Sequence, residues 1–197
     1  MKPLCRSIMF LLIAASFSGC NQQDADSIAK LKEINRRLED EFYTVKEAER
    51  ISLEIYRRTL KYSRTSLDNR QVFWGKDSIN TFPLYELALN PRLLFCFSTN
   101  TCTPCVDSAI GLIKERFADF EHNETILIAG DYPLRLRDNC YGKRMLGGID
   151  LPVAEIEAPF FFVLDKSMKI SFLHIFNKMN PELTKIYLEE IRGKYDF

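Results

Sequence analysis

The sequence lacks a net charge, because its 197 residues carry 27 Lys and Arg and 27 Asp and Glu. A balanced charge gives no general attraction to nucleic acid or to an anionic membrane surface. Glycine is scarce, with 8 residues, and no glycine-rich loop accompanies Gly130 and Asp131 to hold a nucleotide phosphate. Hydrophobic residues make up 46% of the chain. We therefore expect a globular protein with a real core and no nucleic-acid partner.

The N-terminal apolar run, from Ile8 to Phe17, is too short to span a bilayer comfortably. Basic residues precede it and small residues follow it, an order that predicts a signal peptide over residues 1–19. The ending Phe-Ser-Gly-Cys resembles a bacterial lipobox, although Phe17 replaces the usual Leu. This resemblance implies that Cys20 carries lipid after cleavage. Ordinary cleavage that leaves Cys20 unmodified is the alternative.

Proline and glycine are absent from residues 27–64, where apolar residues recur every three or four positions from Ile28 to Ile55. This spacing predicts one long amphipathic helix after a short polar tether, together covering residues 20–70. The apolar stripe of this helix must be buried against another surface. That surface belongs to the following domain, to a second copy joined through residues 28–55, or to another partner.

Residues 71–197 alternate between apolar runs of strand length and helical patterns. The strand pattern predicts a hairpin over 71–82, strands at 92–98, 124–132 and 159–165, and a closing hairpin strand within 166–176. The helical pattern predicts a turn at 83–89, a helix at 105–120, and a last helix capped by Asn180 with Pro181 at its first position. Residues 133–148 form a crossover, either helical or looped. This order predicts an α/β domain with a mixed central sheet and helices on both faces.

Two cysteines, Cys102 and Cys105, lie between the strand at 92–98 and the helix that follows. A helix N-terminus favours an anion, so it stabilises the thiolate that performs disulfide exchange. Cys105 lies in the first turn and can resolve a mixed disulfide, and Pro104 is compatible with that turn. An inert disulfide and half of a zinc site are the alternatives. The closed loop is too short to stabilise much, and no second close pair of ligands exists for zinc.

The stretch FSTNTCTPCVDSAIGLIKERF, residues 97–117, followed by a strand and then by EAPFFFVLD, resembles the thioredoxin-like superfamily. It most resembles the exported, membrane-tethered reductases of the TlpA and ResA kind, from about Val72 to the C-terminus. The resemblance implies a thioredoxin-like fold with Cys102 and Cys105 as the catalytic pair. It also implies a cis-proline loop that pairs with an extended substrate. The implied substrate-binding residues are Thr101, Thr103, Pro104, Ala158 and Pro159.

The chain departs from the family pattern at two places. Thr101 stands where an aromatic residue usually precedes the first cysteine, and Cys96 stands where many members have a buried carboxylate that moves a proton. We expect Cys96 to be a buried apolar residue of its strand. The candidate replacements for the missing acid are Glu86, Glu155 and Glu157.

Two other side chains have both an ordinary and a functional interpretation. Cys140 is either a half-buried bystander or an exposed second thiol. His174 is expected to pack at a sheet surface rather than to act in catalysis.

The sequence therefore predicts a thiol-disulfide oxidoreductase that acts as a reductase, with no metal and no cofactor. Its expected partners are exported protein thiols and disulfides and a membrane electron donor. Its expected location is the bacterial cell envelope, lipid-anchored and facing the periplasm. The alternative is a non-catalytic thioredoxin-like lipoprotein that binds partners through its N-terminal helix.

Overall fold

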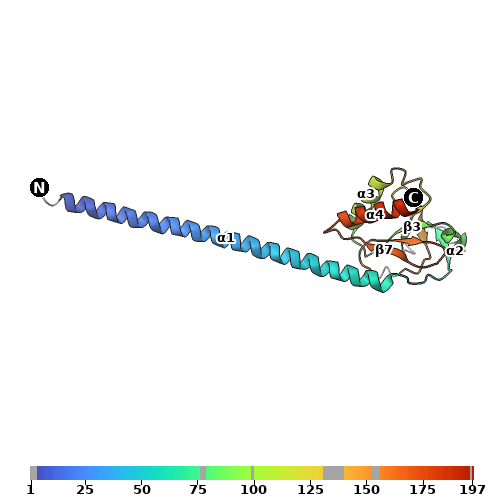
Figure 1. Cartoon of the computed structure of the whole chain (residues 1–197). Coiled ribbons are helices and arrows are strands. Elements are labelled where there is room, and N and C mark those ends of the chain that lie inside the picture. The colour runs from blue at the N-terminus through green and yellow to red at the C-terminus, as the bar shows by residue number, and fades with distance from the viewer. Residues whose placement is uncertain (1–3, 76–78, 99, 131–139, 152–155, 196) are drawn as a thin grey trace. The chain divides into compact units, whose positions relative to one another are not determined.

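The computed structural model describes residues 4–75, 79–98, 100–130, 140–151, 156–195 and 197, with side chains from Asp26 onward. The chain divides into two compact units, Met1–Arg50 and Ile51–Phe197. Helix α1 extends without a break from Leu4 to Tyr62 (Figure 1), which confirms the long N-terminal helix. Residues 21–26, expected as a polar tether, are also helical.

The unit Ile51–Phe197 is built on a mixed sheet, whose described strands number seven in the order β2-β1-β5-β4-β3-β6-β7. They are β1 (Gln71–Trp74), β2 (Thr81–Pro83), β3 (Arg92–Phe97), β4 (Ile126–Gly130), β5 (Met145–Gly147), β6 (Phe160–Leu164) and β7 (Ser171–Ile175). Strands β3, β4 and β5 are parallel to one another. The remaining neighbours pair antiparallel. The hairpins expected near each end of the domain are therefore confirmed.

Helices cover both faces of this sheet. Helices α3 (Thr103–Arg116) and α4 (Glu182–Tyr195) lie together beside the sheet in Figure 1 and share a core with Phe95, Ile128 and Phe161. Helix α2 (Leu84–Ala88) and Tyr62, from the last turn of α1, pack into the core on the other face. The order β3-α3-β4, then the β6-β7 hairpin and α4, is the thioredoxin-like arrangement. The expected α/β thioredoxin-like fold is confirmed.

Strands β3 and β6 are apolar, apart from Arg92 at the start of β3, because both of their faces are covered. Leu93, Leu94, Phe95 and Cys96 of β3 are fully buried, and so is every residue of β6. Phe160 and Phe162 belong to the core on the α2 side, whereas Phe161 belongs to the core under α3 and α4. Burying one such side chain stabilises the fold by roughly 1.5–3 kcal/mol, so β6 is a major contributor to stability.

Three details differ from the sequence-based expectations. Helix α3 ends at Arg116 rather than at residue 120, and Phe117 and Phe120 are buried in the turns that follow. Helix α4 begins at Glu182, because the Pro181 carbonyl accepts its first hydrogen bonds and so precedes the helix. The crossover at 133–148 contains strand β5, whose three residues are too few to show a strand pattern. Its residues 133–139 lie outside the described part of the chain.

Candidate functional site

A compact turn leads from β3 to the cysteine pair. The Thr101 N–H donates to the Ser98 carbonyl at 3.1 Å, and the Ser98 N–H donates to Thr101 Oγ1 at 2.9 Å. The Asn100 N–H donates to Ser98 Oγ at 3.2 Å, so hydroxyl oxygens close this turn. Thr101 is only 7% exposed. The side chain expected to contact substrate thus serves to hold the turn that positions the next residue.

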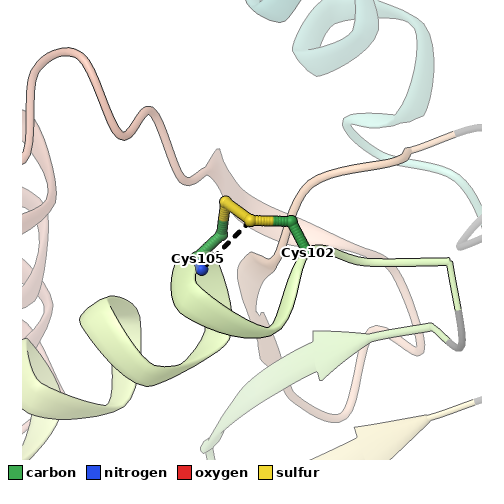
Figure 2. The surroundings of a disulfide bond; sticks show 2 residues. All are labelled: Cys102 and Cys105. Carbon is green, nitrogen blue, oxygen red and sulfur yellow. Dashed lines mark hydrogen bonds between the residues drawn. A yellow bond between two sulfur atoms is a disulfide. The ribbon is translucent and has the colours of Figure 1, made fainter.

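Cys102 is the N-cap of α3 and is joined to Cys105 by a disulfide bond, with 5.3 Å between the two Cα atoms (Figure 2). Cys102 is exposed, whereas Cys105 is half-buried and packs against the core under α3. The Cys105 N–H donates to Cys102 Sγ at 3.3 Å. When the bond is reduced, this N–H and the helix N-terminus stabilise a thiolate on Cys102. The exposed sulfur is therefore the one suited to attack a substrate.

Thr103 and Pro104, between the cysteines, are both exposed in the first turn of α3. The Cys102 carbonyl accepts from the N–H groups of Cys105 and Val106 at 3.0 and 3.1 Å, which closes this turn. Proline has no N–H to donate and fits the first turn without losing a helical hydrogen bond. The two expected substrate-binding residues therefore border the exposed sulfur on the protein surface.

The peptide bond between Ala158 and Pro159 is trans, as are all the other peptide bonds of the described residues. The expectation of a cis-proline loop is therefore wrong. Trans is the favoured isomer of an X-Pro bond, and here the Pro159 carbonyl accepts from the Phe176 N–H at 2.8 Å, which extends the hairpin of β6 and β7. Pro159 is buried and Ala158 is half-buried. Phe160 pairs with Cys96 near the end of β3, so Ala158 and Pro159, which precede Phe160, lie at that same end of the strands.

Cys96 is fully buried in β3, opposite Ala129 on one neighbouring strand and Phe160 on the other. This position confirms the expected buried apolar residue. Burial raises the pKa of the Cys96 thiol well above its usual value, so the thiol stays protonated and cannot act as a base. Of the candidate replacement acids, Glu86 and Glu157 are exposed, and Glu155 lies outside the described residues.

A contact that the sequence did not predict links α3 to the segment before β5. The Tyr141 hydroxyl donates to Asp107 Oδ1 at 2.5 Å, two residues beyond Cys105. Tyr141 and Gly142 have φ angles of 54° and 90°, and Cys140 and Lys143 exchange backbone hydrogen bonds across this tight turn. Cys140 is itself buried, which favours a bystander over an exposed second thiol. A tyrosine before a glycine indicates the tight turn but not the contact of Tyr141 with Asp107.

His174 packs between the sheet and α4, as expected. Its ring stacks on Tyr187 with 4.7 Å between centroids, and its Nε2 lies 2.9 Å from Thr184 Oγ1. Burial lowers the pKa of His174 to about 4. The half-buried imidazole is therefore neutral near neutral pH and helps to pack α4 against β7.

A cleft of roughly 440 Å³ lies where β3 and β4 begin, whereas the cysteine pair follows the other end of β3. Arg92 and Ile126, at the beginnings of β3 and β4, line it together with Trp74 and Lys143. The exposed Cys102 therefore lies outside this cleft.

The described residues offer few other kinds of site. No three His, Cys, Asp or Glu side chains gather there as a bound metal ion would require. Within the same residues, no helix is both long enough and apolar enough to cross a membrane.

No family model matches this chain, and no curated protein matches it. Solved structures do show similarity. A thioredoxin-like protein from Porphyromonas gingivalis is 14% identical, over 67% of this chain and 95% of that one, with a TM-score of 0.41. The exposed lipoprotein thioredoxin of Streptococcus pneumoniae is 17% identical, over 60% and 98% of the two chains, with a TM-score of 0.38.

Peroxiredoxin 5 from Alvinella pompejana is 12% identical, over 65% of this chain and 97% of that one, with a TM-score of 0.43. At these identities the activities of such proteins do not transfer to this chain. The thioredoxin-like fold assigned above rests on the strand order and connections of this chain itself.

Proposed function

We propose that this protein is a thiol-disulfide oxidoreductase whose working pair is Cys102 and Cys105. The observation that carries the proposal is the exposed Cys102 Sγ at the N-cap of α3, bonded to Cys105 and accepting the Cys105 N–H at 3.3 Å. A purely structural disulfide does not require an exposed sulfur at a helix N-terminus. Because the loop that it would close has only four residues, it would also add little stability. Thr103 and Pro104 are exposed beside the sulfur, and the half-buried Ala158 precedes the buried Pro159 at the end of the sheet where β3 ends. We assign the substrate contacts to Thr103, Pro104 and the backbone of Ala158 and Pro159.

The proposed exchange takes place in two steps, the formation of a mixed disulfide and its resolution. The thiolate of reduced Cys102 attacks one sulfur of a substrate disulfide, which forms a mixed disulfide and releases the other substrate sulfur as a thiolate that takes a proton. Cys105 then loses its proton to water and attacks Cys102 Sγ. This step releases the second substrate thiol and leaves the Cys102–Cys105 disulfide. The pair gives two electrons to the substrate, and a dithiol protein at the membrane returns two electrons to the pair.

The proposed setting is the bacterial cell envelope, facing the periplasm. It is supported by the basic, apolar and small-residue order that ends in Phe-Ser-Gly-Cys at Cys20. In this proposal residues 1–19 are removed and Cys20 carries the lipid anchor. Residues 20–70, which contain the rest of α1, then join the anchor to the redox domain at 71–197, which reduces disulfides of exported proteins. The intact mass of the mature protein checks the cleavage and the acyl chains together.

Replacement of single cysteines tests the proposed chemistry. We expect Cys102→Ser to abolish reduction of a fluorogenic disulfide peptide, and Cys105→Ser to accumulate a mixed disulfide with that peptide, visible by intact mass. Cys96→Ala is the matched control, because the Cys96 sulfur is buried in β3 and should not contribute. If Cys102→Ser reduces the peptide at the rate of the unchanged protein, the proposal is wrong.

A non-catalytic interaction protein is the second candidate. Two observations favour it: Cys96 occupies the place of the family's proton-moving acid, and Ala158–Pro159 is trans. The reduction potential of the Cys102–Cys105 pair, measured in glutathione buffers, separates the two functions. A reversible couple between those of thioredoxin and protein disulfide isomerase, about −270 to −180 mV, supports catalysis. A pair that glutathione cannot reduce supports the interaction protein.

A further inference from the structure

The first unit of the chain contains a heptad pattern that the redox chemistry does not use. If Ile28 is taken as position a, the inward positions of three successive heptads are occupied by one amide and five apolar side chains. The a positions are Ile28, Asn35 and Phe42, and the d positions are Leu31, Leu38 and Val45. The five apolar side chains are each between 53% and 66% exposed. An apolar seam of this kind stays in water unless another helix covers it.

The ion pairs within this part of α1 avoid the seam. Arg36 pairs with Glu33 at 2.9 Å and Arg50 pairs with Glu47 at 2.7 Å, all four at outward positions b and f. Of the positions that flank the seam, Ile34 at the first g position is apolar, and the next g position and the e position after it carry opposite charges. Glu41 occupies a g position, and Lys46 occupies the e position that follows it.

We propose that residues 28–48 pair with the same residues of a second copy in a parallel, two-stranded coiled coil. Ile at position a with Leu at position d favours two strands, as in the first heptad. In a parallel pair, the g residue of one helix meets the next e residue of the other. Glu41 therefore meets Lys46 of the second copy, and the symmetry of the dimer makes this pair twice.

Asn35 selects the parallel arrangement over the antiparallel one. In the parallel dimer, position a meets position a, so the two Asn35 amides lie in one layer and hydrogen-bond each other. In the antiparallel dimer that buries the same seam, each Asn35 faces Leu38 and its amide has no cross-helix partner, which is costly when buried. In the single chain, Asn35 Nδ2 donates to Glu39 Oε1 at 2.9 Å on the exposed surface. A single Asn at position a sets register and strand number in this way.

The seam ends where the second unit begins. Glu49 and Ser52 occupy the next a and d positions and interrupt the apolar repeat. Beyond them, Ile55 and Tyr62 face the core of their own unit. The apolar side of α1 thus changes its partner near Arg50, from a second copy to the sheet domain.

Sedimentation equilibrium of the full chain in detergent, with micelles in excess over protein, tests this proposal. We expect a dimer, and Leu38→Ala should raise its dissociation constant roughly a hundredfold or more, because both copies lose a d side chain. Glu41→Lys should raise it roughly tenfold, because two attractive pairs become repulsive. Adding Lys46→Glu to that variant should restore it to within about threefold. Asp40→Lys makes the same charge change at the outward f position and should leave it unchanged.

Three results would overturn the proposal. They are a monomer at about 100 μM, a dimer that Leu38→Ala does not weaken, and a Glu41→Lys defect that Lys46→Glu does not repair. The last result would mean that the helices pair antiparallel or in another register. None of these measurements depends on the cysteines, so the proposal stands or fails separately from the redox function.

Discussion

The two units of this chain treat their apolar residues in opposite ways. In the unit Ile51–Phe197, every residue of β3 from Leu93 to Cys96 and every residue of β6 is buried within the same unit. In the unit Met1–Arg50, the large apolar side chains that the structure describes are all more than half exposed.

The comparison teaches that an amphipathic pattern identifies an apolar face without identifying what covers it. The sheet covers its faces with helices of its own unit, because short connections return α3 and α4 onto it. A single helix has no such return. The free energy of unfolding should therefore depend on the apolar residues of the second unit and hardly on those of the first.

The sharpest comparison replaces phenylalanine by alanine in each unit. Phe162→Ala removes a fully buried ring from β6 and should lower the free energy of unfolding by about 3–5 kcal/mol. Phe42→Ala removes a ring that is 56% exposed and should change that free energy by less than about 0.5 kcal/mol. Urea unfolding followed by the fluorescence of Trp74, the only tryptophan, measures the sheet unit alone. Equal losses from the two variants would contradict the division between the units.

A second comparison is made within α1, near the end that packs on the sheet. Tyr62 is 7% exposed and belongs to the core, whereas Leu60, two residues earlier, is 60% exposed. Tyr62→Ala should lower the free energy of unfolding by about 3 kcal/mol, and Leu60→Ala by less than about 0.5 kcal/mol. The same urea experiment gives both values. If Leu60→Ala proves the more damaging variant, α1 packs on the sheet through a different face.

A smaller effect should appear when the pH is lowered. The pKa of His174 is lowered to about 4 in the folded chain, below the ordinary value of 6.5, so the unfolded chain binds the proton first. The stabilisation is complete above pH 6.5 and is lost as the pH falls toward 4. It amounts to about 2 kcal/mol between pH 7 and pH 5. His174→Gln keeps a polar group near Thr184 Oγ1 and should abolish this part of the pH dependence. An unchanged pH profile in that variant would show that His174 is not its source.

Much of the domain could be predicted because its strongest patterns are local. Continuous apolar runs identified β3 and β6 as doubly covered strands, and the end of β3 followed by a helical pattern put Cys102 at a helix N-terminus. The isomer of Ala158–Pro159 could not be read in this way. The two isomers of an X-Pro bond differ by only about 0.5–1 kcal/mol, so tertiary contacts decide between them.

Contacts between distant segments were equally out of reach. Tyr141 and Asp107 are 34 residues apart, and nothing near either one indicates the other. Strand β5 consists of three residues that pair with β4 and β1, too few for any alternation to be visible in the sequence. The missed features therefore share one cause, which is that their partners are set by the assembled sheet.

The burial of Cys96 has a practical consequence for anyone handling this protein. A maleimide or iodoacetamide added to the reduced, folded domain meets Cys102 at the surface, whereas Cys96 becomes reachable only when β3 separates from β4 and β6. The rate at which Cys96 is modified thus measures how often the whole domain opens. It can be read by mass spectrometry from the same sample that reports the fast reaction of the exposed thiol.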